Sequence, residues 1–174
     1  MPIGLDTELP RWTIAVFAAV FWLMQRGLRR SVRLWALVTL PATMLHELAH
    51  ALVGLMLSAR PASWSLWPRR VGTTAWRLGY VGFTNLRWWN GGAVALAPLA
   101  WALVIAAIAR QAPEVPMRLP LAWSAGLGVA LVWLWIAVAP GRSDWTLARQ
   151  YWLSALCFLG AWAGAFYLLV APPL

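Results

Sequence analysis

The sequence predicts an all-α integral membrane protein with about five transmembrane helices (four to five) and a small strand-like interfacial loop. Three observations support this fold class. Of the 174 residues, 62% are hydrophobic and only 11% are charged, whereas roughly 25% of the residues of a soluble domain are charged. Several apolar runs approach the roughly 20 residues that a helix needs to cross a bilayer. Many of the 15 tryptophans lie near the ends of these runs, where amphipathic rings favour the membrane interface.

Four apolar segments are predicted to span a membrane, and a fifth is shorter. The four segments are residues 34–57, 91–109, 121–139 and 151–170. The fifth, residues 12–24, is followed by Gln25 and several arginines. It either spans, with the arginine side chains extending to the surface, or lies in the interface. We expect residues 1–174 to form a single membrane-embedded domain without a separate soluble domain.

The longest connection, residues 58–90, follows the first of these four segments. Its residues 63–67 and 78–84 carry the aromatic and β-branched content of short strands, and turn-forming residues separate them. This pattern predicts a small hairpin at the membrane surface. An irregular interfacial loop held by tryptophans fits the same composition.

The charge of the chain is strongly positive, with 14 basic residues, all arginine, against 5 acidic residues. These arginines lie between apolar segments instead of gathering on one polar face, so they indicate anchoring to the lipid bilayer and not nucleic-acid binding. Their distribution over the two sides is too even for the positive-inside rule to give the orientation. The single cysteine, Cys157, excludes a disulfide framework and a cysteine-cluster metal site.

The segment 34–57 contains His46-Glu47-Leu48-Ala49-His50, an H-E-x-x-H motif. On a helix, the two histidines lie roughly 40° apart on one face, so both rings can reach one metal ion. Glu47 lies on the flank, where a carboxylate can accept a proton from a water molecule without being a ligand. Two histidine ligands, a water and a carboxylate base are what zinc hydrolases use. A polar helix-packing cluster, or a histidine pair that holds another cofactor, are the alternatives.

A third protein ligand is sought among the remaining acidic residues, which are Asp6, Glu8, Glu114 and Asp144. Asp144 follows the span 121–139 and opens on the same side as the nearer end of the motif helix. Pro140 and Gly141 should end that span and let Asp144 turn back toward the histidines. Asp144 is therefore the predicted third ligand, and its alternative role is to cap the start of the last helix.

These residues together resemble the site-2 protease family of intramembrane zinc metalloproteases, over most of the chain from residue 34 to about residue 150. The matching positions are His46, Glu47 and His50, residues 78–81 as a strand region, Ala97-Pro98-Leu99 as a turn in the next helix, and Ser143-Asp144 as the aspartate ligand. The resemblance implies a core of three helices and a Zn²⁺ ion buried below the membrane surface. It also implies cleavage of the transmembrane segment of a membrane-protein substrate, with Glu47 as the catalytic base, in the bacterial inner membrane.

Two departures leave other functions open. Ala97 stands where the family has the glycine of a Gly-Pro pair, and Trp101 and Ala102 stand where an asparagine often follows. A non-catalytic membrane protein with a structural or regulatory zinc site would tolerate both changes. A membrane metal transporter is a third candidate, but it would carry further polar ligands along its helices.

Overall fold

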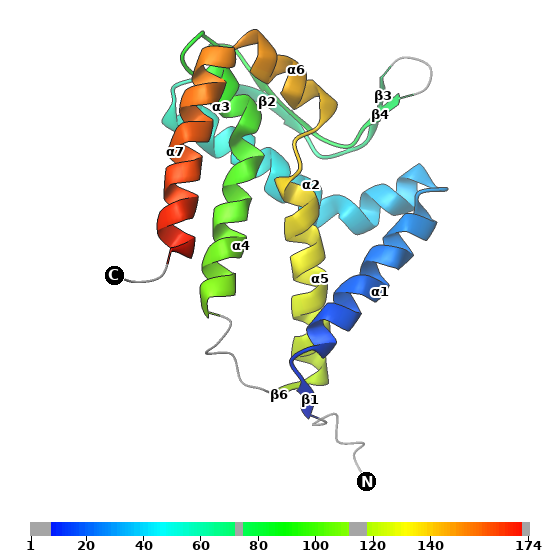
Figure 1. Cartoon of the computed structure of the whole chain (residues 1–174). Helices are drawn as coiled ribbons and strands as arrows, with labels where there is room; N and C mark the ends of the chain where they lie inside the picture. The colour runs from blue at the N-terminus through cyan, green and yellow to red at the C-terminus, as the bar shows by residue number, and fades with distance from the viewer. Residues whose placement is uncertain (1–7, 72–74, 112–117, 172–174) are drawn as a thin grey trace.

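The structure is a computed structural model, and it describes residues 8–71, 75–111 and 118–171 (Figure 1). Helices make up most of the described chain, and short antiparallel strands accompany them. The helices are α1 (Thr13–Leu28), α2 (Val32–Met56), α3 (Gly91–Leu96), the 3₁₀ turn η1 (Ala97–Leu99), α4 (Ala100–Gln111), α5 (Leu121–Val138), α6 (Arg142–Gln150) and α7 (Trp152–Val170). The strands are β1 (Glu8–Pro10), β2 (Pro61–Ser65), β3 (Arg69–Val71), β4 (Ala75–Arg77), β5 (Tyr80–Phe83) and β6 (Arg118–Pro120).

Four helical segments of the described chain are long and apolar enough to cross a membrane. They are Val32–Met56, Gly91–Arg110, Leu121–Gln150 and Trp152–Val170. Each contains or closely matches one of the four predicted spans, which confirms where the apolar helices lie. The shorter predicted segment, residues 12–24, forms α1, whose 16 residues fall below the spanning length. Among the described residues, the number of helical segments long enough to span is therefore four, the lower end of the predicted range of four to five.

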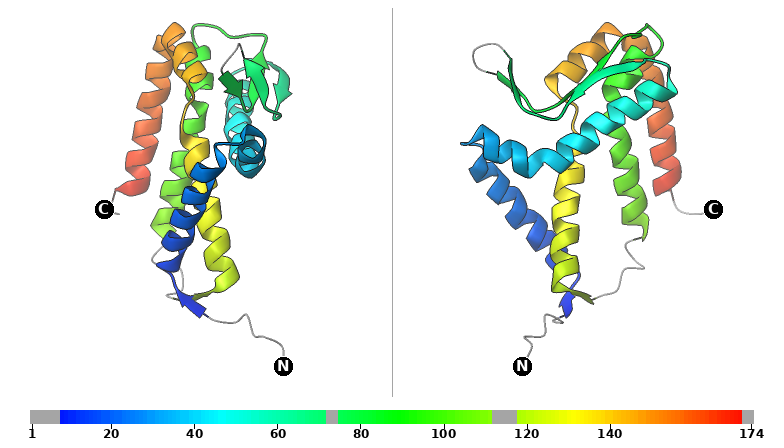
Figure 2. Two further views of the ribbon diagram at one scale, coloured as in Figure 1. Left: turned by 90° about the vertical axis from the view of Figure 1, so that its right-hand side faces the viewer. Right: turned by 180° about the vertical axis from the view of Figure 1, so that it is seen from behind.

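Helices α4, α5 and α7 run along a common direction, and α2 crosses them at a steep angle (Figures 1 and 2). Helix α2 contains Pro41, which has no N–H to donate within the helix and bends it. Helix α1 packs along α5, while α3 packs against α6 and α7. The middle of α2 thus passes close to both α3 and α5, and this is the stretch that carries the H-E-x-x-H motif.

The long connection forms strands, which confirms the predicted hairpin over the irregular loop. Strands β2 and β5 pair in antiparallel fashion, with Ser63 opposite Gly82. Between them along the chain, β3 and β4 form a second antiparallel pair, with Arg69 opposite Arg77. A third pair, β1 with β6, was not predicted. It brings the starts of α1 and α5 together, so the two helices leave from the same end of the molecule (Figure 1).

A glycine allows α3 to lie directly against the start of α7. A Cβ atom on Gly92 would collide with backbone atoms of Tyr151 and Ala155, so the close approach depends on the missing side chain. The Gly92 N–H donates a hydrogen bond to Ser154 Oγ at 2.8 Å, which fixes the two segments together. The neighbouring Val94 is fully buried. This packing holds the backbone of α3 rigidly beside α2.

Candidate metal centre

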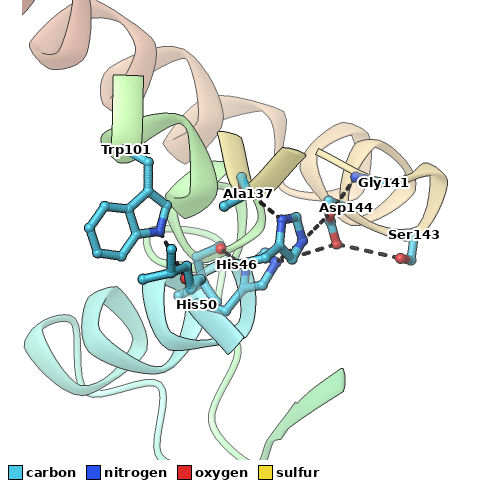
Figure 3. Close-up of polar contacts among 9 residues, drawn as sticks. His46, His50, Trp101, Ala137, Gly141, Ser143 and Asp144 are labelled. Atoms are coloured by element: carbon cyan, nitrogen blue, oxygen red, sulfur yellow. Dashed lines mark hydrogen bonds and ion pairs between the residues drawn. The ribbon is translucent and has the colours of Figure 1, made fainter. Parts of the chain in front are cut away.

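The two histidines of the motif face one another on α2, as the spacing predicted. Their Nε2 atoms are 3.2 Å apart, and their ring centroids are 4.8 Å apart at an interplanar angle of 77°. His50 and Glu47 are buried, with 6% and 7% of their surfaces exposed, and His46 is half-buried. The histidines therefore present two nitrogen atoms to one point inside the protein (Figure 3).

Asp144 completes this cluster, as predicted. Its Oδ2 lies 3.3 Å from His46 Nε2, and its Oδ1 lies 3.6 Å from His50 Nε2. Asp144 lies in the first turn of α6, far along the chain from the two histidines on α2. The fold therefore brings the three side chains together. The other candidate acids, Asp6 and Glu114, lie outside the described residues, as does the side chain of Glu8.

Asp144 also takes part in helix capping, but not as the N-cap that the alternative prediction made it: it is the third residue of its helix, and Gly141 is the N-cap. Its Oδ2 accepts a hydrogen bond from the Gly141 N–H at 2.6 Å, and this satisfies a backbone donor at the start of α6. The capped helix is α6 and not the last helix, α7. Ser143 Oγ adds a contact of 3.4 Å to Asp144 Oδ1. The same carboxylate therefore takes part in capping α6 and lies beside the two histidines.

Pro98 explains how His50 is held. In an uninterrupted helix, the Val94 carbonyl would accept a hydrogen bond from the N–H four residues later, but that residue is Pro98, which has no N–H. The chain tightens there into η1, and Ala97 N–H bonds the same carbonyl. His50 Nδ1 then contacts the Val94 oxygen at 2.7 Å. A proline in the neighbouring helix therefore leaves a carbonyl available to orient a histidine.

Pro140 has the same effect for His46. It ends α5 because the preceding residue is extended, so the Gly141 N–H does not bond the Ala137 carbonyl as it would in a continued helix. Gly141 donates to Asp144 instead. The Ala137 oxygen accepts His46 Nδ1 at 3.0 Å. The interruption of α5 thus frees the carbonyl that orients His46 and positions the acid that faces it.

These contacts fix which nitrogen of each histidine carries hydrogen. A carbonyl oxygen only accepts hydrogen bonds, so Nδ1 is the donor in both rings, and Nε2 of a neutral ring has a lone pair. Both Nε2 atoms and the Asp144 carboxylate then face one another as acceptors. Such a group of acceptors needs a cation between its members, either a proton on a ring or a metal ion. Histidines in metal sites commonly have their second nitrogen held in this way.

The spacing of the candidate ligand atoms is suited to a single metal ion. Ligands 2.0–2.1 Å from a tetrahedral ion lie about 3.3 Å from one another. The two Nε2 atoms are 3.2 Å apart, and they lie 3.3 Å and 3.6 Å from two different oxygens of Asp144, Oδ2 and Oδ1. With one ligand atom from each residue, the atoms of His46, His50 and Asp144 lie within 4.8 Å of one another, which is close enough to bind one metal ion. Two neutral nitrogens and a carboxylate oxygen are also a donor set that zinc accepts.

Two cavities flank the cluster, with volumes of about 270 Å³ and 540 Å³. Both are lined by Glu47, Arg77, Gly79, Ser143 and Asp144. The smaller cavity also reaches His50 and all of β5, whereas the larger reaches His46. Glu47 packs closely on Gly79, where an added Cβ would lie 2.9 Å from Glu47 Oε1. The cluster therefore adjoins two cavities that lie between α6 and the segment formed by Arg77, Gly79 and β5.

Sequence reasoning missed several residues that support the site. Trp101 Nε1 donates to the Leu45 carbonyl at 2.8 Å, one residue before His46, and so joins α4 to the motif (Figure 3). Trp133 makes a similar bond of 2.9 Å to the Val38 carbonyl. Tryptophan inside an apolar span is the only signal for such bonds, and it is equally typical of simple packing. Gly79 gave no signal of its closeness to Glu47.

The chain matches no family model, no curated protein and no solved structure.

Proposed function

We propose that the chain is an integral membrane zinc metalloprotease, similar to site-2 proteases, that cleaves membrane-protein substrates in or near their transmembrane segments. We infer the bacterial inner membrane as its location. The observation that carries the proposal is the mutual facing of His46 Nε2, His50 Nε2 and Asp144 beside the buried carboxylate of Glu47. A buried acid and two histidines on an apolar helix cost stability, so a site of this kind indicates function.

His46, His50 and Asp144 would hold the zinc ion. Among the described residues the cluster has these three protein ligands, and three protein ligands with one open position are typical of catalytic zinc, whereas structural zinc is enclosed by four. When bound, the ion would supply Lewis-acid activation of a water molecule and of the scissile carbonyl. The Val94 and Ala137 carbonyls keep the two rings oriented for this role.

Glu47 has the position of a general base. It follows His46 directly on α2, it does not belong to the ligand cluster, and it lines both cavities. Its carboxylate would accept a proton from the attacking water and return it to the leaving amine. Burial against Gly79 restricts the motion of this side chain, which keeps it in one orientation for the proton transfer.

Strand β5 offers a way to hold the substrate. It pairs with β2 on one side and lines the smaller cavity along its length. A substrate helix must unwind before its peptide bonds can be attacked, because the bonds are buried inside an intact helix. An unwound segment would extend along β5 and gain backbone hydrogen bonds as an added strand.

A non-catalytic protein with a structural or regulatory zinc site is the alternative. Trp101 favours it, because this residue stands where the resembled family often has an asparagine, and its indole N–H is already bonded to the Leu45 carbonyl. That donor is then not available to a substrate. This alternative requires a fourth protein ligand, which would close the position that hydrolysis needs.

Metal content and cleavage by the purified chain test the proposal together. We expect wild type to contain about one zinc ion per chain and His46→Ala to contain none. Asp144→Asn is the sharper variant, because asparagine retains an acceptor for the Gly141 N–H but loses the charged ligand; it should weaken zinc binding without unfolding α6. Glu47→Gln should retain zinc and lose cleavage of a single-span reporter substrate. Full cleavage by Glu47→Gln would refute the assignment of the base.

A further inference from the structure

Two arginines lie directly opposite one another in the β3–β4 hairpin. Arg69 of β3 pairs with Arg77 of β4 in the antiparallel register. Directly paired residues project from the same face of a two-stranded sheet, and like charges in such a pair are destabilising. Both side chains are exposed. The hairpin therefore carries an unfavourable pair of positive charges, which an anion between them would make favourable.

Of this arginine pair, Arg69 and Arg77, Arg77 lies at the proposed active site and Arg69 lies near it. Arg77 lines both cavities together with Glu47. The guanidinium carbon of Arg69 lies 5.8 Å from the centre of the Tyr80 ring, and Tyr80 lines the smaller cavity. The hairpin and α6 lie at the same end of the helices (Figures 1 and 2). The positive charge is thus set beside the opening of the site and not only on the outer surface.

No carboxylate of the described residues, 8–71, 75–111 and 118–171, forms an ion pair with either arginine. Glu47 shares the cavities with Arg77 and interacts with its charge at a distance longer than that of an ion pair. Arg142 lines the larger cavity from the α6 side and adds a further positive charge. An anion in the larger cavity therefore meets Arg77 and Arg142, and an anion in the smaller cavity meets Arg77, which pairs with Arg69 across the hairpin.

We propose that Arg69 and Arg77 bind an acidic side chain of the substrate and thereby select substrates with aspartate or glutamate next to the apolar segment that is cut. This inference rests on the proposed protease function, whose substrate class it specifies. The planar guanidinium groups match a carboxylate in two-point hydrogen bonding. An acid bound here would lie in line with a chain extended along β5, since Tyr80 begins that strand. Anionic lipid headgroups fit less well, because Arg77 lines the cavities that contain Glu47.

A binding experiment tests the proposal without requiring cleavage. The protein is the full chain carrying Glu47→Gln, in detergent micelles without anionic lipid. The probes are two labelled synthetic peptides, each an apolar span, flanked in one by aspartates and in the other by asparagines. We expect fluorescence anisotropy to give about tenfold tighter binding of the aspartate peptide, as for other hydrogen bonds to charged groups.

Variants of the two arginines test whether the tighter binding of the aspartate peptide depends on Arg69 and Arg77. Arg77→Gln and Arg69→Gln should each reduce binding of the aspartate peptide to nearly that of the asparagine peptide. Arg118→Gln, on β6 at the opposite end of the molecule, is the matched control and should change nothing (Figure 1). Melting temperatures should stay the same or rise in Arg69→Gln, because the substitution removes a repulsive pair. Arg77→Glu should reverse the preference and bind a lysine-flanked peptide.

Two results would overturn the inference. One is equal binding of the two peptides by the wild-type arginine pair. The other is an effect of Arg77→Gln on association with phosphatidylglycerol vesicles alone, which would assign the pair to lipid headgroups. The protease proposal fails separately, through missing zinc or missing cleavage in the chain with Glu47 intact. A failure of one proposal can therefore be told from a failure of the other.

Discussion

Replacing Pro98 with alanine is expected to weaken zinc binding although Pro98 is not a ligand. Proline leaves the Val94 carbonyl without its helical donor, and His50 Nδ1 contacts this oxygen at 2.7 Å. Alanine supplies an N–H at the position from which a regular helix would bond that carbonyl. The new donor competes with His50, whose ring then loses its fixed orientation toward Asp144.

The size of the effect follows from the lost contact. Removing a partner that orients a metal-bound histidine typically lowers metal affinity by about 10- to 100-fold, or about 1.4–2.7 kcal/mol. Stability of the metal-free protein should change less, by about 1 kcal/mol, since the gained backbone hydrogen bond offsets part of the lost burial of the proline ring. The variant should therefore lose much of its metal affinity while the stability of the metal-free protein changes less.

Zinc affinity is measured by competition with a chromophoric chelator, and stability by denaturant unfolding of the metal-free protein in detergent. Pro98→Val is the second variant, because it also supplies an N–H but keeps more of the side-chain volume. Gly126→Ala in α5 is the control, since its added methyl group meets no atom within 4 Å. Wild-type zinc affinity in both Pro98 variants would refute the idea that the proline orients His50.

Two further substitutions test the surroundings of the site. In Gly79→Ala the new Cβ would lie 2.9 Å from Glu47 Oε1 and 2.7 Å from Thr43 Cγ2. The carboxylate must then shift by about 0.5 Å, and we expect about tenfold slower cleavage with unchanged zinc content; cleavage at the wild-type rate would contradict this role of the glycine. Trp101→Phe removes the 2.8 Å hydrogen bond to the Leu45 carbonyl. It should lower the free energy of unfolding by about 1 kcal/mol, and an unchanged denaturation midpoint in detergent would show that the bond contributes nothing.

The apolar helices and the cluster of candidate ligands were predictable because the sequence offers few alternatives. Helices long and apolar enough to span a membrane follow from length and hydrophobicity alone. All four predicted segments lie in such helices, although Leu121–Gln150 extends past the predicted end at residue 139. His46 and His50 are the only two histidines of the chain, so their spacing on one helix face was informative. Asp144 could be found by elimination because a chain with 5 acidic residues has few candidate ligands.

Other features depend on tertiary contacts that no local pattern encodes. The crossing of α2 over α4, α5 and α7 is set by packing, and hydrophobicity along the chain does not specify it (Figure 2). Helix α6 lies outside the predicted segments, because its nine residues include Arg142, Asp144 and Arg149 and lack an apolar run. The pairing of β1 with β6 joins residues far apart in the sequence. For these elements, contacts with distant parts of the chain determine the structure, and the local sequence does not.

The two prolines connect the fold to the chemistry more tightly than the motif alone suggests. Pro98 and Pro140 each interrupt a helix, which would ordinarily cost stability. Each interruption removes the N–H that a regular helix would direct at one carbonyl four residues earlier. That carbonyl accepts one histidine Nδ1–H. The second interruption also releases the Gly141 N–H, which aims Asp144. The two helix interruptions therefore make possible three of the contacts that position the site. A substitution that restores regular helix at either proline should weaken metal binding more than it lowers the stability of the fold.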